Sequence, residues 1–267
     1  MTSYLSYFKL KFKVGLQYRA AAISGIFTQV FFGIIYISIY NAFYESGSGS
    51  IPMPYNQLVS YIWVTQAFFG LIFMWYKDKE LVNLIKSGNL AYELARPQNL
   101  YFMWYSKILG ERLSLFSLRF IPVLLLGLIL PYPFHMSFTF SIVRFIIFLI
   151  TVFLGTLLMS AIGVFFHILI IFTLEDKGVV SMAMILADLL SGIGVPLPFF
   201  PKAFQIVAYL MPFRYVSDLP FRLLVGNIPI NEGLIGIVVQ LFYIIILIFF
   251  GNKLMKKALK RAVIQGG

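Results

Sequence analysis

Cysteine is absent from this sequence, and charged residues are scarce. With no Cys among 267 residues, the chain can form neither a disulfide framework nor a thiolate metal site. Only 12% of the residues are charged and 60% are hydrophobic, whereas an ordinary soluble domain has about 25% charged and about 45–50% apolar residues. A soluble fold of this length could not bury that much apolar surface, but a bilayer can accommodate it. The composition predicts an all-α integral membrane protein, with residues 1–267 as one domain and no room for a globular companion.

The sequence also lacks the short motifs of common catalytic sites. No G-x-x-x-x-G-K-[ST] phosphate loop occurs, so we do not expect the chain to bind ATP in the usual way. Neither an H-E-x-x-H metal motif nor a G-x-S-x-G nucleophile motif is present. The two histidines, His135 and His167, are far apart in sequence, and an intramembrane His167 could serve either a function or structural hydrogen bonding. We therefore expect no catalytic residue, no metal site and no cofactor on this chain, which is not expected to be an enzyme.

Six long apolar runs, nearly free of charge, predict six transmembrane helices. A helix satisfies its own backbone hydrogen bonds in lipid, and about 20 apolar residues span the hydrocarbon core. The runs lie between Arg19 and Glu45, from Gln57 to Tyr76, from Lys107 to Leu130, between Arg144 and Glu175, from Gly178 to Val195 and from Gly233 to Asn252.

The basic residues predict which way the spans point. The net charge is +11; basic clusters attract nucleic acid, but they also mark the cytoplasmic flanks of membrane proteins, and the hydrophobicity favours the second interpretation. We therefore expect contact with membrane lipid and not with nucleic acid. Lys and Arg collect in the first 19 residues, after the second run and in the C-terminal tail, so both termini are predicted to be cytoplasmic. Lys202, Arg214 and Arg222 break this trend.

Two apolar segments do not read as spans. Tyr4–Arg19 mixes aromatic and aliphatic residues with three lysines at roughly helical spacing, which is typical of an amphipathic helix in the headgroup layer; the alternative is an extension of the first span. Ser191–Asn227 is too rich in proline for one helix and too apolar for a solvated loop. It is predicted to form a re-entrant pair of short helices on the outer side, marked by Gly192, Pro196, Pro198, Pro201 and Pro212.

Two charges fall inside the predicted spans, Arg119 in the third and Asp188 in the fifth. An ion in lipid is costly, so both side chains are expected in the protein interior. They could pair structurally within the bundle, or Asp188 could couple transport to protons.

The loop from Lys77 to Arg112 carries a short amphipathic helix. Leu81, Leu84 and Ile85 share one face, charged residues occupy the other positions, and Gly88 ends the helix. A second turn is predicted over Leu90–Leu94. A helix of this kind between two spans suits docking into a groove of a soluble partner; the alternative is an interfacial helix without a partner.

Three sequence stretches resemble one family of membrane proteins. They read IKSGNLAYELARPQN at residues 85–99, SGIGVPLPFFP at 191–201 and LMPFRY at 210–215. They resemble type-2 ABC transporter permeases, and more narrowly a bacterial subfamily whose small permeases are often encoded in adjacent pairs.

The resemblance implies a permease dimer in the bacterial cell membrane, formed with an identical or homologous chain. Two copies of an ATP-binding cassette ATPase subunit would hold the ATP and magnesium and drive export of a hydrophobic or amphipathic substrate. Tyr4–Arg19 would be the elbow helix. The contacts that couple ATPase to permease would be Lys79, Glu80, Leu81, Leu84, Ile85, Lys86, Leu90, Glu93 and Leu94. Aromatic residues of the second and fifth spans would line the cavity.

Two other classes remain as alternatives. A proton-coupled secondary transporter would usually show an inverted repeat with paired broken helices, whereas the sequence has one broken region. A channel or scaffold would need a polar stripe along a span, and no span shows one clearly.

Overall fold

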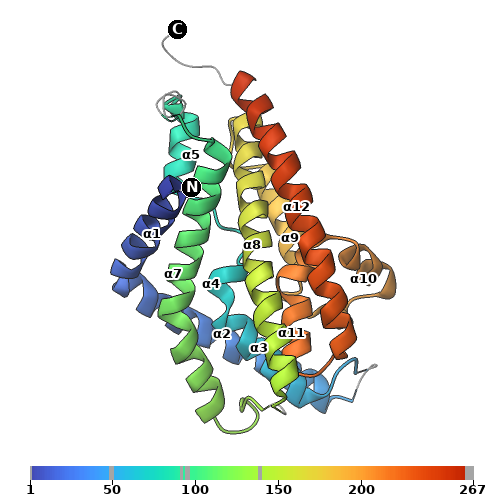
Figure 1. Cartoon of the computed structure of the whole chain (residues 1–267). Helices are drawn as coiled ribbons and strands as arrows, with labels where there is room; N and C mark the ends of the chain where they lie inside the picture. Colours follow the sequence, from blue (N-terminus) through green and yellow to red (C-terminus); the bar gives the residue numbers. More distant parts are fainter. Residues whose placement is uncertain (1, 48–50, 91–92, 94–96, 138–139, 262–267) are drawn as a thin grey trace.

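The computed structural model describes residues 2–47, 51–90, 93, 97–137 and 140–261. All regular elements within these residues are helices, as the composition predicts. Figure 1 shows a helical bundle in which the start of α1 (Thr2–Gln17), the short α5 (Lys79–Lys86) and the end of α12 (Ile230–Arg261) lie at the same end.

Among the described residues, four helices are long and apolar enough to cross a membrane: α2 (Arg19–Glu45), α7 (Leu100–Ile129), α8 (Ile142–Thr173) and α12. At about 1.5 Å per residue, each exceeds the roughly 30 Å of a hydrocarbon core. The predicted fifth run is the shorter α9 (Val179–Ser191). The predicted second run is divided into α3 (Tyr55–Ala67) and α4 (Phe69–Ile72). The chain is therefore a multi-pass membrane protein, while the count of six spans stays a prediction.

The second run is divided because it fills the centre of the bundle. Every residue from Leu58 to Ala67 is buried, and the helix breaks at Phe68, whose φ and ψ are −91° and 4°. Just beyond the break, Gly70 lies against the backbone of α7, where an added Cβ would come within 2.8 Å of the Phe116 nitrogen. α4 therefore continues in a direction set by its close approach to α7.

α8 is the central long helix. In its most apolar stretch 61% of the residues are buried, against 22% for each of α2, α7 and α12. It packs along α12 on one side and against α7 on the other (Figure 1). Small residues permit this, since the Gly163 position lies within van der Waals contact of Ile108 on α7.

α1 is a helix of its own and not an extension of the first span. Tyr18 leaves the helical conformation between α1 and α2, and α1 packs along α7. At the closest approach, a Cβ on Gly110 would come within 2.8 Å of the Phe8 carbonyl oxygen. The position of α1 in a headgroup layer stays a prediction.

The proline-rich segment folds into short helical pieces, in agreement with the sequence. Gly192, with φ of +82°, ends α9, a conformation that favours glycine. The pieces that follow are η1 (Leu197–Phe199), α10 (Lys202–Tyr209), η2 (Pro212–Val216) and α11 (Asp218–Leu224). Pro196, Pro198, Pro201 and Pro212 lie in or next to the first turns of η1, α10 and η2. α11 is buried, while α10 projects from the side of the bundle (Figure 1). Re-entrant placement of this segment in a membrane stays a prediction.

Candidate coupling site and transport cavity

The helix α5 is fixed at its first turn by Asp78. The Asp78 carboxylate accepts hydrogen bonds from the Glu80 N–H at 2.8 Å and the Leu81 N–H at 3.1 Å, which caps the helix. The Asp78 N–H itself donates to Nε2 of His167 on α8, 3.1 Å away. Nδ1 of His167 lies 2.7 Å from the Gly163 carbonyl, so the ring donates at Nδ1 and accepts at Nε2. His167, which is fully buried, thus has a structural hydrogen-bonding role at the base of α5.

A buried lysine joins α5 to α7 and α1. The Lys107 ammonium of α7 is 1% exposed and lies 2.5 Å from Asp78 Oδ2, 2.7 Å from Glu80 Oε2 and 3.9 Å from Glu111 Oε1. Lys11 of α1 donates to the same Glu80 carboxylate at 2.7 Å. In the sequence, Lys107 marks only the start of the third apolar run. Two features of the sequence could have indicated a buried ion pair at Lys107. It adjoins a long apolar run, and Glu111 follows it by four residues.

These contacts lower the pKa of Glu80. Partial burial alone would raise it, but the hydrogen bonds from Lys107 and Lys11 outweigh burial and bring the pKa from 4.5 to about 2. Because the folded pKa lies below the unfolded one, Glu80 contributes stability above about pH 4.5, and this contribution fades as the pH falls towards about 2.

We therefore expect the melting temperature of the detergent-solubilised chain to fall less steeply between about pH 5 and pH 3 in Glu80→Gln than in the native chain. Melting curves followed by intrinsic fluorescence measure this. Glu175→Gln, at another exposed carboxylate, is the matched control and should keep the native slope. Equal slopes for native and Glu80→Gln would contradict the ion pairs at Glu80.

Arg112 fixes the end of the second run next to this cluster. Its guanidinium is 1% exposed and donates to the carbonyls of Leu71 at 3.0 Å and Phe73 at 2.9 Å. These are carbonyls at the C-terminal end of α4, which lack partners within the helix. The same guanidinium lies over the Tyr76 ring, 5.4 Å from its centroid. The chain from α4 to α5 is therefore held against α7 along its length.

The far end of α5 is joined to the connection between α8 and α9. Lys86 forms an ion pair with Asp176, and Lys77 contacts Asp176 and donates to the Ser181 hydroxyl at 2.9 Å. The hydrogen bond from Lys86 is the main reason why the pKa of Asp176 is lowered. α5 thus contacts α1, α7, α8 and the connection between α8 and α9, and a displacement of α5 must be shared with all of them.

The predicted coupling contacts divide between two faces of α5. Leu81, Ile85 and Leu90 are buried against the rest of the chain. Lys79, Glu80 and Lys86 are exposed, together with Asn83, and Leu84 is half-buried. Glu93 is helical, whereas Leu94 lies outside the described residues. Leu81 and Ile85 attach α5 by packing, and Glu80 and Lys86 attach it by ion pairs. Lys79, Asn83 and Leu84 are the part of its outer face that a partner can reach.

A cavity of about 220 Å³ lies between α2, the region of α3 and α4, and the end of α9. Its polar lining residues are Thr28, Gln29, Gln66 and Asp188, and its other lining residues are mostly aromatic. The second predicted span contributes aromatic lining residues, as the sequence analysis expects. The fifth contributes Asp188 but no aromatic residue, and the other aromatic residues come from α2. Asp188 therefore lies at a cavity, half-buried.

Arg119 lies elsewhere and does not pair with Asp188. Its guanidinium donates to the Ala21 carbonyl of α2 at 3.2 Å, while Asp188 has a hydrogen bond with the Trp75 side chain. Both side chains are half-buried, and their interior position stays a prediction.

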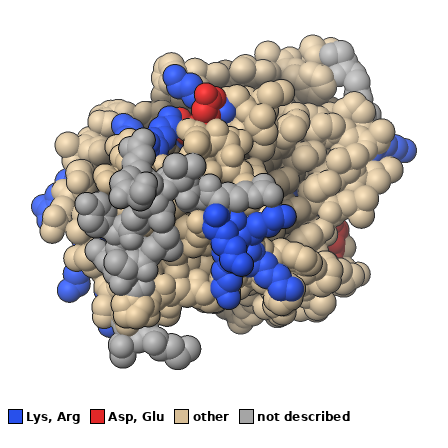
Figure 2. Space-filling model, turned by 90° about the horizontal axis from the view of Figure 1, so that it is seen from above, with Lys and Arg blue, Asp and Glu red and all other residues tan. Residues whose placement is uncertain are grey.

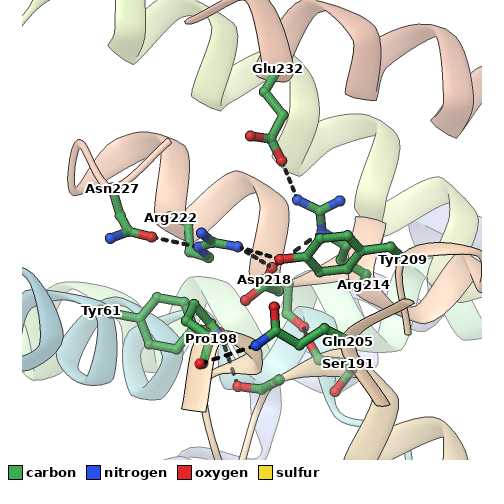
Figure 3. A network of polar contacts seen from close by, with 12 residues as sticks. Tyr61, Ser191, Pro198, Gln205, Tyr209, Arg214, Asp218, Arg222, Asn227 and Glu232 are labelled. Carbon is green, nitrogen blue, oxygen red and sulfur yellow. Dashed lines mark hydrogen bonds and ion pairs between the residues drawn. The ribbon is translucent and has the colours of Figure 1, made fainter. Parts of the chain in front are cut away.

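A second buried ionic network holds the proline-rich segment together (Figure 3). Asp218 of α11, fully buried, accepts from Arg214 Nε at 3.3 Å and Arg222 Nη1 at 3.5 Å. Arg214 also pairs with Glu232 of α12 and lies 3.8 Å from the centroid of the Tyr209 ring. In the sequence, Arg214 and Arg222 stand out only as exceptions to the charge bias. The structure explains these exceptions, because both arginines are paired with carboxylates inside the protein.

The fold and these sites define a multi-pass membrane protein with a largely aromatic cavity that holds one carboxylate, and with a loop helix anchored by ion pairs. A family model described as ABC-2 family transporter protein matches residues 55–266, which is more than half of the chain. The chain therefore belongs to the ABC-2 transporter family, and the resemblance to type-2 ABC permeases is confirmed. Permeases of this family are the membrane component and work with ATP-binding subunits. No match was found among curated proteins.

Proposed function

We propose that this chain is the permease subunit of an ATP-binding cassette exporter in a bacterial cell membrane. Two permease chains, identical or homologous, form the membrane part, and two ATPase subunits bind ATP and magnesium on the cytoplasmic side. The substrate is hydrophobic or amphipathic and moves outward. The observation that carries the proposal is α5, which presents an exposed polar face and is anchored to α1, α7, α8 and the α8–α9 connection. It lies at the end of the bundle where α1 begins and α12 ends (Figure 1).

The charge distribution supports a cytoplasmic position for this end. Seen from above, Lys and Arg side chains are spread over it, with few Asp or Glu (Figure 2). Four of these residues are exposed lysines on the last turns of α12, namely Lys253, Lys256, Lys257 and Lys260. Basic residues flank spans on the cytoplasmic side, which is also where ATP is available.

In this mechanism, closure of the ATPase subunits around ATP pushes on α5. The displacement passes through Lys107 to α7, through His167 to α8, and through Asp176 to the connection that leads into α9. α9 and α7 flank the second run, so the push changes the shape of the cavity at Asp188. The ATPase chemistry stays on the partner subunits.

Purification of the chain from detergent-solubilised native membranes tests the proposal. We expect an ATPase subunit to co-purify and to hydrolyse ATP. Leu84→Asp and Lys79→Glu change the reachable face of α5 and should each reduce ATPase recovery about tenfold, as for a residue central to an interface. Lys202→Glu makes the same charge change on exposed α10, and recovery should then be native.

A chain that elutes alone and without ATPase activity would contradict the permease assignment. Transport driven by a proton gradient through Asp188 would then be the function to test, with Asp188→Asn assayed over a range of external pH.

A further inference from the structure

The cavity between α2, α3, α4 and α9 contains a buried amide without a partner. Gln29 of α2 is 3% exposed, and neither its Nε2 nor its Oε1 has a hydrogen-bond partner. A buried polar group left unpaired costs roughly 1–3 kcal/mol. Because Gln29 lines the cavity, a ligand seated there can supply the missing hydrogen bonds.

The charge of the lining residues determines whether the cavity favours a positively or a negatively charged ligand. Among the described lining residues, Asp188 is the only Asp or Glu, and none is Lys or Arg. The described partner of the Asp188 carboxylate is the indole of Trp75, which donates a hydrogen bond but carries no charge. The negative charge therefore faces the cavity uncompensated, although the chain as a whole carries +11. An anionic ligand would be repelled here, whereas a cation would be attracted.

The remaining lining favours a soft, poorly hydrated cation. Five of the lining residues are aromatic: Phe32, Tyr36, Phe69, Phe73 and Trp75. Aromatic faces around a carboxylate are the chemistry that recognises organic ammonium groups, through cation–π attraction and burial of methyl groups. The volume of about 220 Å³ is below the range of about 300–1,000 Å³ typical for sites that enclose a whole drug-sized molecule. It accommodates a headgroup whose apolar chain extends beyond the cavity.

We propose that this cavity binds the cationic, ammonium-type headgroup of an amphipathic substrate, with Asp188 as the counter-ion and Gln29 as a hydrogen-bonding partner. The inference rests on the proposed function, because it names the substrate class of the permease. Thr28 and Gln66 supply further polar contacts at the headgroup.

Equilibrium dialysis with the full-length chain in nanodiscs of zwitterionic lipid tests the proposal without the ATPase subunits. The probes are octyltrimethylammonium and octanesulfonate, which share a chain and differ in headgroup charge, and empty nanodiscs correct for partition into lipid. We expect saturable binding of the ammonium probe only. Asp188→Asn should weaken it about tenfold or more, Gln29→Leu should weaken it several-fold, and Asp188→Glu should retain it.

Glu175→Gln removes the same charge at an exposed position outside the cavity and should leave binding unchanged. Equal ammonium binding by the native chain and Asp188→Asn, absence of saturable binding, or a preference for the sulfonate would each overturn the proposal. If Asp188→Asn fails to fold, Gln29→Leu and Asp188→Glu decide the question in the same assay. An ATPase that co-purifies with a chain lacking Asp188-dependent binding would refute the ligand class alone. Binding by a chain that recovers no ATPase would refute the exporter assignment alone.

Discussion

Lys107→Met is expected to lower the free energy of unfolding by about 3–5 kcal/mol, the cost of leaving a buried charge without its partner. The carboxylate that loses its partner is Asp78, whose side chain is 4% exposed. Asp78 cannot turn to water without giving up the cap of α5, so the loss concentrates on the helix that we expect to contact the ATPase. Unfolding of the chain in mixed detergent micelles, titrated with a denaturing detergent, measures the change.

Two variants serve as controls for Lys107→Met. Lys256→Met removes an exposed lysine on α12 and should change stability by no more than about 0.5 kcal/mol. Lys107→Met combined with Asp78→Asn removes both charges but keeps an oxygen that can cap the helix, so it should be more stable than Lys107→Met alone. A Lys107→Met chain as stable as Lys256→Met would show that the buried ion pair is not formed.

Asp218→Asn is expected to be similarly damaging, with a loss of about 3–5 kcal/mol. Asp218 is fully buried and is shared by Arg214 and Arg222, so its neutralisation leaves two largely buried guanidinium groups facing each other. The same unfolding titration measures this loss, and limited proteolysis within residues 191–227 locates it.

Glu232→Gln is the internal control for Asp218→Asn. Glu232 also pairs with Arg214, but its side chain is 34% exposed, so water replaces the lost partner and the loss should be far smaller. Equal losses for the two variants would contradict the central position of Asp218 in the network.

The sequence predicts well where local chemistry decides the structure. α5 begins after Asp78 and ends before Gly88, as its amphipathic spacing and helix-ending glycine indicate. The long apolar runs become α2, α7, α8 and α12 because a continuous helix is what satisfies their backbone. The prolines divide Ser191–Asn227 into short pieces because each ring fixes φ and removes a donor.

The sequence predicts poorly where two distant segments decide the structure together. The break at Phe68 depends on the close approach of Gly70 to α7, and no local signal records that approach. The surroundings of charged residues within apolar runs are equally hard to predict from the sequence. Arg119 and Asp188 both fall within apolar runs, yet one faces α2 and the other faces a cavity, because rotation of a helix about its axis is set by its neighbours.

The partners of Lys107 illustrate the limit most clearly. Asp78 and Glu80 come from the segment before α7, and Glu80 is shared with Lys11 of α1. A pairing of Lys107 with Glu111 could be read from their spacing, but that contact is the longest of the three, at 3.9 Å. The shorter contacts of Lys107 with Asp78 and Glu80 could not be predicted, because they depend on how the loop folds back on α7.

The break in the second run also determines where the chain can bend under load. On the C-terminal side of the break, Arg112 binds the carbonyl oxygens of Leu71 and Phe73. α4, the following segment and α5 therefore move as one rigid unit with α7. On the N-terminal side of the break, α3 is buried among other helices from Leu58 to Ala67. Phe68 is thus the hinge between the rigid unit that contains α4 and α5 and the buried helix α3. A force on α5 would reach the wall of the cavity through Phe69 and Phe73, which lie on the α4 side of this hinge.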